Sequence, residues 1–133
     1  MRPINNNITE TYCSFEVSKL LKEKGFDVKC EYFFNEGSGW RLQNDYLIRS
    51  GDDMIIETPT HALAIEWIRV NWGLWVQPYQ HYTKYSWDVM QYEYKGHYNV
   101  SIANGRTFHS ECYASPQEAT EAALLYTLTN LIN

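Results

Sequence analysis

The segment from Trp72 to Trp87 holds the densest group of side chains suited to molecular recognition. It reads WGLWVQPYQHYTKYSW, and six of its sixteen residues are aromatic. Aromatic side chains stack on bases and sugars, and they are enriched in the cores of protein interfaces. The candidate binding residues are Trp72, Trp75, Tyr79, Tyr82, Tyr85 and Trp87. The alternative is that the same rings pack beneath helices and along cross-strand pairs.

The charges around these rings favour a protein partner, or a second copy of the chain, over nucleic acid. Residues 72–98 contain two cations, Lys84 and Lys95, and two acidic residues, Asp88 and Glu93, offset them. The whole chain carries a formal charge of −5, with a pI of about 5.3. A nucleic-acid groove needs basic residues between its aromatic rings. Binding of single-stranded nucleic acid by stacking is therefore the second hypothesis, and a homo-oligomeric structural protein is the third. A sugar ligand has no support beyond the rings.

Patterns for catalysis, metals or cofactors are missing from the sequence. No G-x-S-x-G, P-loop or dinucleotide fingerprint occurs, and no cysteine or histidine spacing matches a zinc site. His109 and Cys112, three apart in an expected strand, face opposite sides. The acidic residues Asp52, Asp53 and Glu57 fit no calcium loop. We expect no catalytic residue, metal or cofactor, and the sequence favours binding over catalysis. The cysteines are Cys13, Cys30 and Cys112, and the histidines are His61, His81, His97 and His109.

The odd number of cysteines favours reduced thiols, and hence a cytoplasmic protein. The first residues, MRPINNNITETYC, are polar and do not resemble a signal peptide. No apolar run approaches the roughly 18 residues of a membrane span, so no membrane association is expected.

Helix signals are local and occur three times. Ser14 is the expected N-cap of a helix over 15–24, which Gly25 ends. A second helix is expected to begin with Thr58 as N-cap and Pro59 at its first position, and to end at Gly73. The third begins at SPQE, where Ser115, Pro116 and Glu118 supply N-cap, first-turn proline and capping box.

Strand signals fill the remaining segments. Strands are expected over 27–34, 74–80, 87–94, 97–103 and 106–113, with a short one at 46–48. Pro78 indicates a sheet edge or a bulge. Asn104-Gly105 predicts a type I′ hairpin turn, in which both residues have positive φ, and 95–96 a tight turn. In strand 74–80, Trp75, Gln77 and Tyr79 share one face.

The resulting order is α-β-(β)-α-β-β-β-β-α. It predicts a single α+β domain over residues 1–133, with residues 1–11 frayed. Its mostly antiparallel sheet of about four to five strands is covered by three helices.

Three segments of the chain resemble a group of known sequences: SFEVSKLLKEKGFDVKCEYFF, TPTHALAIEWIRVNWGLWVQPY and YASPQEATEAALLYTLTNLI. Together they resemble small uncharacterised proteins of gut bacteria and their phages or prophages. The resemblance implies a phage- or prophage-related accessory role and transfers no functional residue. The order over 58–133 is also similar to the double-stranded-RNA-binding fold. That fold grips phosphates with a basic helix start, whereas here the last helix opens SPQEATEA, which is acidic.

Overall fold

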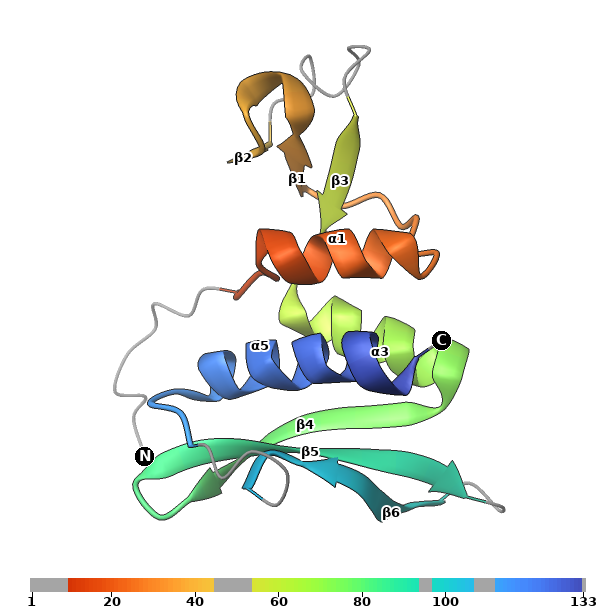
Figure 1. Cartoon of the computed structure of the whole chain (residues 1–133), viewed down its shortest axis with the longest axis vertical. Helices are drawn as coiled ribbons and strands as arrows, with labels where there is room; N and C mark the ends of the chain where they lie inside the picture. The colour runs from red at the N-terminus through yellow and green to blue at the C-terminus, as the bar shows by residue number, and fades with distance from the viewer. Residues whose placement is uncertain (1–9, 45–53, 94–96, 107–111, 133) are drawn as a thin grey trace, which may run out of the picture.

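The computed structural model describes residues 10–44, 54–93, 97–106 and 112–132 (Figure 1). The chain folds as an α+β domain, as the sequence predicts. Its elements are α1 (Phe15–Glu23), β1 (Tyr32–Asn35), η1 (Glu36–Ser38), β2 (Arg41–Gln43), β3 (Ile55–Thr58), α3 (His61–Trp72), β4 (Leu74–His81), β5 (Lys84–Glu93), β6 (His97–Asn104), α5 (Pro116–Tyr126) and η2 (Thr127–Leu131).

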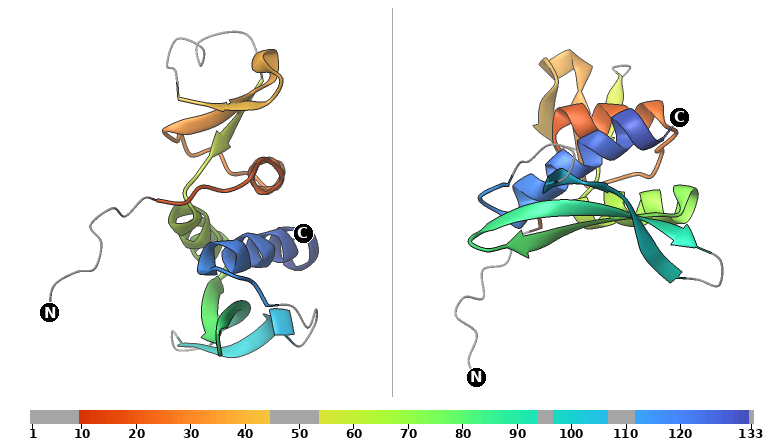
Figure 2. Two further views of the ribbon diagram at one scale, coloured as in Figure 1. Left: turned by 90° about the vertical axis from the view of Figure 1, so that its left-hand side faces the viewer. Right: turned by 60° about the horizontal axis from the view of Figure 1, so that its bottom comes forward.

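The strands divide between two antiparallel sheets of three, ordered β2-β1-β3 and β4-β5-β6, where the sequence suggested one sheet. Figure 1 shows α3 and α5 on one face of the β4-β5-β6 sheet, α1 beyond them, and the small sheet beyond α1. The left view of Figure 2 shows the same layers from the side. Because α1 contacts both β3 and α5, helices separate the two sheets. Of the two positions predicted for Pro78, the sheet edge is the one observed, since β4 is an outer strand.

The main core lies between the β4-β5-β6 sheet and the helices. The two buried alanines of α5, Ala119 and Ala123, let this helix approach β4 and β5 closely. Trp87 of β5 is buried in this core and its ring lies 5.2 Å from that of Tyr126. The other fully buried apolar side chains of the cluster include Val17, Leu21, Ile68, Val76, Val89, Leu124 and Leu128.

The helix caps agree with the sequence in two of three cases. Ser14 and Ser115 accept hydrogen bonds from backbone N–H groups in the first turns of α1 and α5, as predicted. The prediction for α3 was wrong at its start, because Thr60 is the N-cap there, and not Thr58. Thr58 instead pairs with Tyr32 as the last residue of β3. The predicted end of α3 is confirmed, with Gly73 at φ 67°.

Two strand boundaries differ from the prediction. β1 begins at residue 32 instead of 27. Ahead of it the backbone N–H of Cys30 donates to the Glu57 carboxylate and takes no place in a strand ladder. The hairpin between β4 and β5 turns at residues 82–83, and β5 starts at Lys84 instead of Trp87. The strand expected at 46–48, the turn at 95–96 and most of the strand at 106–113 lie outside the described residues.

The predicted type I′ turn at Asn104-Gly105 was also wrong. Neither residue has positive φ. The side chain of Asn104 accepts a hydrogen bond from the backbone N–H of Arg106, which closes a local turn. Glycine is required at 105 for a different reason, because the indole of Trp87 packs directly against its Cα.

The start of the described chain is tied to the domain. The fraying expected for residues 1–11 falls mostly outside the described residues, but the carbonyl of Thr11 accepts a hydrogen bond from the backbone N–H of His61.

Candidate functional site

The face of the β4-β5-β6 sheet that points away from the helices carries part of the predicted aromatic site. Side chains alternate along β4. Leu74 and Val76 are buried against the helices, while Trp75, Gln77 and Tyr79 are half-buried on the opposite side, as predicted. We call that side the outer sheet face. It comprises Trp75, Gln77 and Tyr79 of β4, Asp88 and Met90 of β5, and Ser101 of β6. None of the helices in the described chain lies on it (Figures 1 and 2).

Hydrogen bonds order this face. The indole N–H of Trp75 donates to Oε1 of Gln77 at 3.0 Å. The Tyr79 hydroxyl lies 3.4 Å from the side-chain oxygen of Asn104. Next to Trp75 the surface is hollowed by about 340 Å³, between that ring, Gln77, Met90 and the side chain of Arg69. The face therefore offers a fixed mixture of apolar surface and polar groups.

The six predicted residues do not all lie together. Trp75 and Tyr79 share the outer sheet face, and Tyr82 lies at the tip of the β4–β5 hairpin with 85% of its surface exposed. Tyr85 and Trp87 follow the alternation onto the helix side of β5. Trp87 is only 1% exposed, so it contributes to the core and not to an exposed surface. Trp72 ends α3, with its ring centroid 4.9 Å from that of Trp67.

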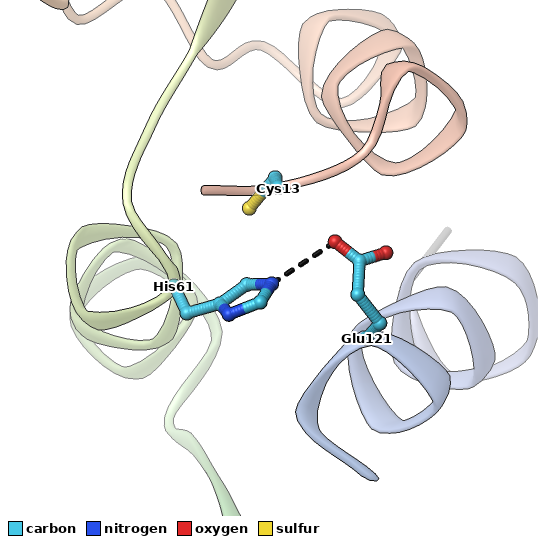
Figure 3. A group of neighbouring side chains, drawn as sticks. All are labelled: Cys13, His61 and Glu121. Carbon is cyan, nitrogen blue, oxygen red and sulfur yellow. Dashed lines mark hydrogen bonds and ion pairs between the residues drawn. The ribbon is translucent and has the colours of Figure 1, made fainter. Parts of the chain in front are cut away.

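A second cluster of reactive side chains was not predicted from the sequence (Figure 3). Cys13 precedes α1, His61 begins α3 and Glu121 lies in α5. The sulfur, a ring nitrogen and a carboxylate oxygen of these residues all lie within 4.8 Å of one another. Nε2 of His61 is 3.0 Å from Oε1 of Glu121, and Nδ1 is 2.8 Å from the hydroxyl of Thr11. We call this group the Cys13–His61–Glu121 cluster.

Backbone pairing fixes two of the three positions. Residues 11–13 run beside residues 59–61, where Cys13 N–H donates to the carbonyl of Pro59 at 3.0 Å and His61 N–H to that of Thr11 at 2.9 Å. Glu121 reaches this junction from α5 and accepts the backbone N–H of Ser14 at 2.6 Å. The cluster thus joins the start of α1, the start of α3 and the middle of α5.

The protonation states follow from the surroundings. Burial raises the pKa of the Cys13 thiol far above its usual range, and the nearby Glu121 carboxylate raises it further. Burial also acts to raise the pKa of Glu121, but hydrogen bonds from His61 and Ser14 outweigh it and hold that pKa below its usual value. At neutral pH the thiol is protonated and the carboxylate ionised. A protonated, buried thiol is not a nucleophile.

His61 and Glu121 of the cluster line an open pocket of about 790 Å³, together with Lys84 and Cys112 among others. None of the three cysteines forms a disulfide. No local signal could have revealed this site, because His61 and Glu121 are 60 residues apart and Cys13 is separated from His61 by α1, β1, η1, β2 and β3. The pairing of residues 11–13 with 59–61 brings Cys13 and His61 together, and the packing of α5 brings Glu121 to them.

No protein-family model, curated protein or solved structure matches this chain. In the described part of the chain, no helix has the length and apolar character needed to cross a membrane. The outer sheet face and the Cys13–His61–Glu121 cluster are the features of the described chain that bear on function.

Proposed function

We propose that this domain is a protein-binding module that engages its partner through the outer sheet face. The observation that carries the proposal is the position of Trp75 and Tyr79. Both side chains are half-buried, Trp75 opposite Met90 and Tyr79 opposite Ser86, on a sheet face that no helix of the described chain covers. Tyrosine, tryptophan and methionine are the side chains enriched at the centres of protein interfaces, where charged groups are depleted.

The polar groups of the face suit a protein partner as well. Gln77 and Asp88 lie opposite each other on β4 and β5, and Ser101 donates a hydrogen bond to Asp88. An interface of ordinary size makes about ten direct hydrogen bonds around its apolar centre. The amide, hydroxyl and carboxylate groups held around the rings of Trp75 and Tyr79 can supply hydrogen bonds of this kind.

The size of the face limits the affinity. β4 has eight residues, and at about 3.3 Å per residue and roughly 4.8 Å between strands the three-stranded face measures roughly 26 by 14 Å. That is about half of the roughly 800 Å² that each partner contributes to a standard interface. The partner must also contact neighbouring surface, and a weak, micromolar complex is expected.

The hairpin tip is the natural extension of the face. Tyr82 is 85% exposed and adopts φ 55°, a left-handed conformation that is unfavourable for a bulky residue. Strained backbone that presents an exposed side chain is a feature of recognition sites. Tyr82 thus supports a contact surface that runs from the outer sheet face to the tip of the hairpin.

Nucleic acid fits this surface less well. The cation in the hairpin is Lys84, the chain carries a net charge of −5, and α5 begins with Glu118 in its first turn. A single strand could stack on Trp75 and Tyr79, but its phosphates would meet few positive charges. Single-strand binding and self-association are therefore the competing outcomes of the test.

The test starts from the tagged protein and a lysate of a gut bacterium, the source that the resemblance to phage and prophage proteins suggests. One half of the lysate is treated with nuclease, and captured proteins are identified by mass spectrometry. The identified partner is then purified, and its dissociation constant is measured by calorimetry. Analytical ultracentrifugation of the domain alone measures self-association.

Two substitutions connect binding to the outer sheet face. Trp75→Ala and Tyr79→Ala should each weaken the purified complex at least tenfold, the effect of losing an interface anchor. Val70→Ala on the exposed side of α3, where Val70 is 65% exposed, is the control and should bind like the wild type. Wild-type affinity in both face variants, or loss of the native fold in both, would contradict the proposal. Capture that disappears with nuclease would favour nucleic acid, and a concentration-dependent dimer disrupted by the same variants would favour self-association.

A further inference from the structure

We propose that Cys13, His61 and Glu121 together bind one divalent transition-metal ion, with Zn²⁺ the closest match to the ligand set. This site is separate from the outer sheet face, and it does not depend on the proposed protein-binding function.

The donor atoms favour zinc by type. Proteins bind zinc with three kinds of donor atom: a thiolate sulfur, an imidazole nitrogen and a carboxylate oxygen. Mg²⁺ and Ca²⁺ instead select oxygen ligands. Catalytic zinc sites have three protein ligands and leave the fourth position for water or substrate, whereas structural zinc sites have four protein ligands. In the described chain, the Cys13–His61–Glu121 cluster is the group with these ligands.

The distances are close to those of a formed site. In a tetrahedral site with bonds of about 2.0–2.3 Å, neighbouring donor atoms are roughly 3.3–3.7 Å apart. The three donor atoms here lie within 4.8 Å of one another, and Nε2 of His61 is 3.0 Å from Oε1 of Glu121. Side-chain movements on the order of 1 Å would therefore bring the three donor atoms to the separations of a tetrahedral site. The backbone pairing of residues 11–13 with 59–61 would stay unchanged.

The groups around the ligands also match a metal site. Metal-binding histidines use one ring nitrogen for the metal and hydrogen-bond through the other, which fixes the ring. Nδ1 of His61 is bonded to the hydroxyl of Thr11 at 2.8 Å. A hydroxyl can donate or accept, so this bond persists when the ring proton shifts from Nε2 to Nδ1 and leaves Nε2 free for a metal. Glu121 is oriented in the same way, by the backbone N–H of Ser14.

The pocket gives an ion access to the cluster. The side chain of Glu121 is 29% exposed and that of His61 9%, while Cys13 is 3% exposed. An ion that enters through the pocket therefore meets the carboxylate first and the sulfur last. On binding, the S–H bond of Cys13 breaks, a sulfur–metal bond forms and the proton is released to solvent.

The alternative is that the three side chains only connect α1, α3 and α5 through hydrogen bonds. Cobalt distinguishes the two, because tetrahedral Co²⁺ bound to a thiolate has visible and near-ultraviolet absorption that neither free Co²⁺ nor an oxygen site shows. The full chain is reduced, stripped with a chelator and titrated with Co²⁺. We expect cobalt–thiolate absorption that saturates at one ion per chain and is displaced by Zn²⁺. Its absence at a stoichiometric excess of Co²⁺ would overturn the proposal.

Variants assign the ligands. The Cys30→Ser/Cys112→Ser double variant keeps Cys13 as the remaining thiol and should retain the absorption, whereas Cys13→Ser should lose it. Glu121→Gln keeps an acceptor for Ser14 and should weaken Co²⁺ binding at least tenfold. Its control is Glu118→Gln, since Glu118 lines the same pocket and accepts a backbone N–H from Ala114. Circular dichroism of each metal-free variant checks its fold.

The pattern of losses decides between a site and adventitious binding. Equal loss in the Glu118→Gln and Glu121→Gln variants, or loss in the double cysteine variant, would show that Co²⁺ binds elsewhere. If Cys13→Ser fails to fold, the comparison of Glu121→Gln with Glu118→Gln still tests the assignment.

Discussion

Replacing Gly105 with alanine should destabilise the domain through contacts with two identifiable residues, Trp87 and Ser86. A Cβ at this position would lie 2.5 Å from Nε1 and 2.8 Å from Cδ1 of Trp87, and 2.9 Å from the hydroxyl of Ser86. Trp87 is 1% exposed and Ser86 0%, so neither side chain can move into solvent. The backbone at 105 is not left-handed, so the penalty comes from the contact and not from φ.

The magnitude follows from two opposing effects. Forcing an extra carbon into a packed core costs about 1–3 kcal/mol. Replacing glycine by alanine where φ is compatible returns roughly 0.4–1 kcal/mol by restricting the unfolded chain. We expect Gly105→Ala to lower the free energy of unfolding by about 1–2 kcal/mol. For a domain of this size that corresponds to a fall in Tm of roughly 3–10 °C.

Urea unfolding followed by circular dichroism measures this change, and a double variant assigns its cause. In a Trp87→Leu background the indole is missing and only the Ser86 contact remains, so the cost of Gly105→Ala should fall by at least about 0.5 kcal/mol, because contacting residues couple. Gly25→Ala is the control. Its Cβ meets nothing within 4 Å but φ is +102°, so its cost of about 1–2 kcal/mol should be the same in both backgrounds. An unchanged stability of Gly105→Ala, or an equal cost with and without the indole, would refute the reasoning.

Two further predictions concern other parts of the chain. In the native, metal-free protein, Cys13 should react with iodoacetamide far more slowly than Cys30 and Cys112, because it is 3% exposed and burial raises its thiol pKa. Mass spectrometry of peptides after timed quenching measures the order in which the three cysteines react. Equal rates would contradict the described burial. Ser115→Ala removes the oxygen that accepts the Glu118 backbone N–H and should lower the free energy of unfolding by about 1 kcal/mol. Ser115→Gly should lower it by only a few tenths of a kcal/mol, since glycine is a tolerated N-cap. Urea unfolding compares the two variants, and an equal effect of both would argue against the cap.

Helix positions were predictable where the signal is local. Ser14 and Ser115 cap α1 and α5 by bonding N–H groups three residues later, an interaction contained within one turn. The start of α3 was not predictable in this way, since Thr58 and Thr60 are both suitable caps. The choice depends on distant segments, because Thr58 pairs with Tyr32 in β3 and Thr60 forms a bridge with Tyr12. Tertiary pairing therefore decides between two locally equivalent helix starts.

The aromatic site shows how one turn length decides which face a residue occupies. A six-residue connection over 81–86 leaves the register between β4 and β5 open, and Trp87 can then be grouped with Trp75. The two-residue turn pairs His81 with Lys84, and this register sets Trp87 opposite Pro78, on the helix side. Because side chains alternate with a period of two, a shift of one residue moves every ring to the other face. Sequence alternation thus identifies which residues of β4 share a face. The length of the turn decides whether the rings of β5 lie on the same face as those of β4. This turn requires a left-handed φ at Tyr82. Tyrosine seldom adopts that conformation, so the sequence does not indicate the turn.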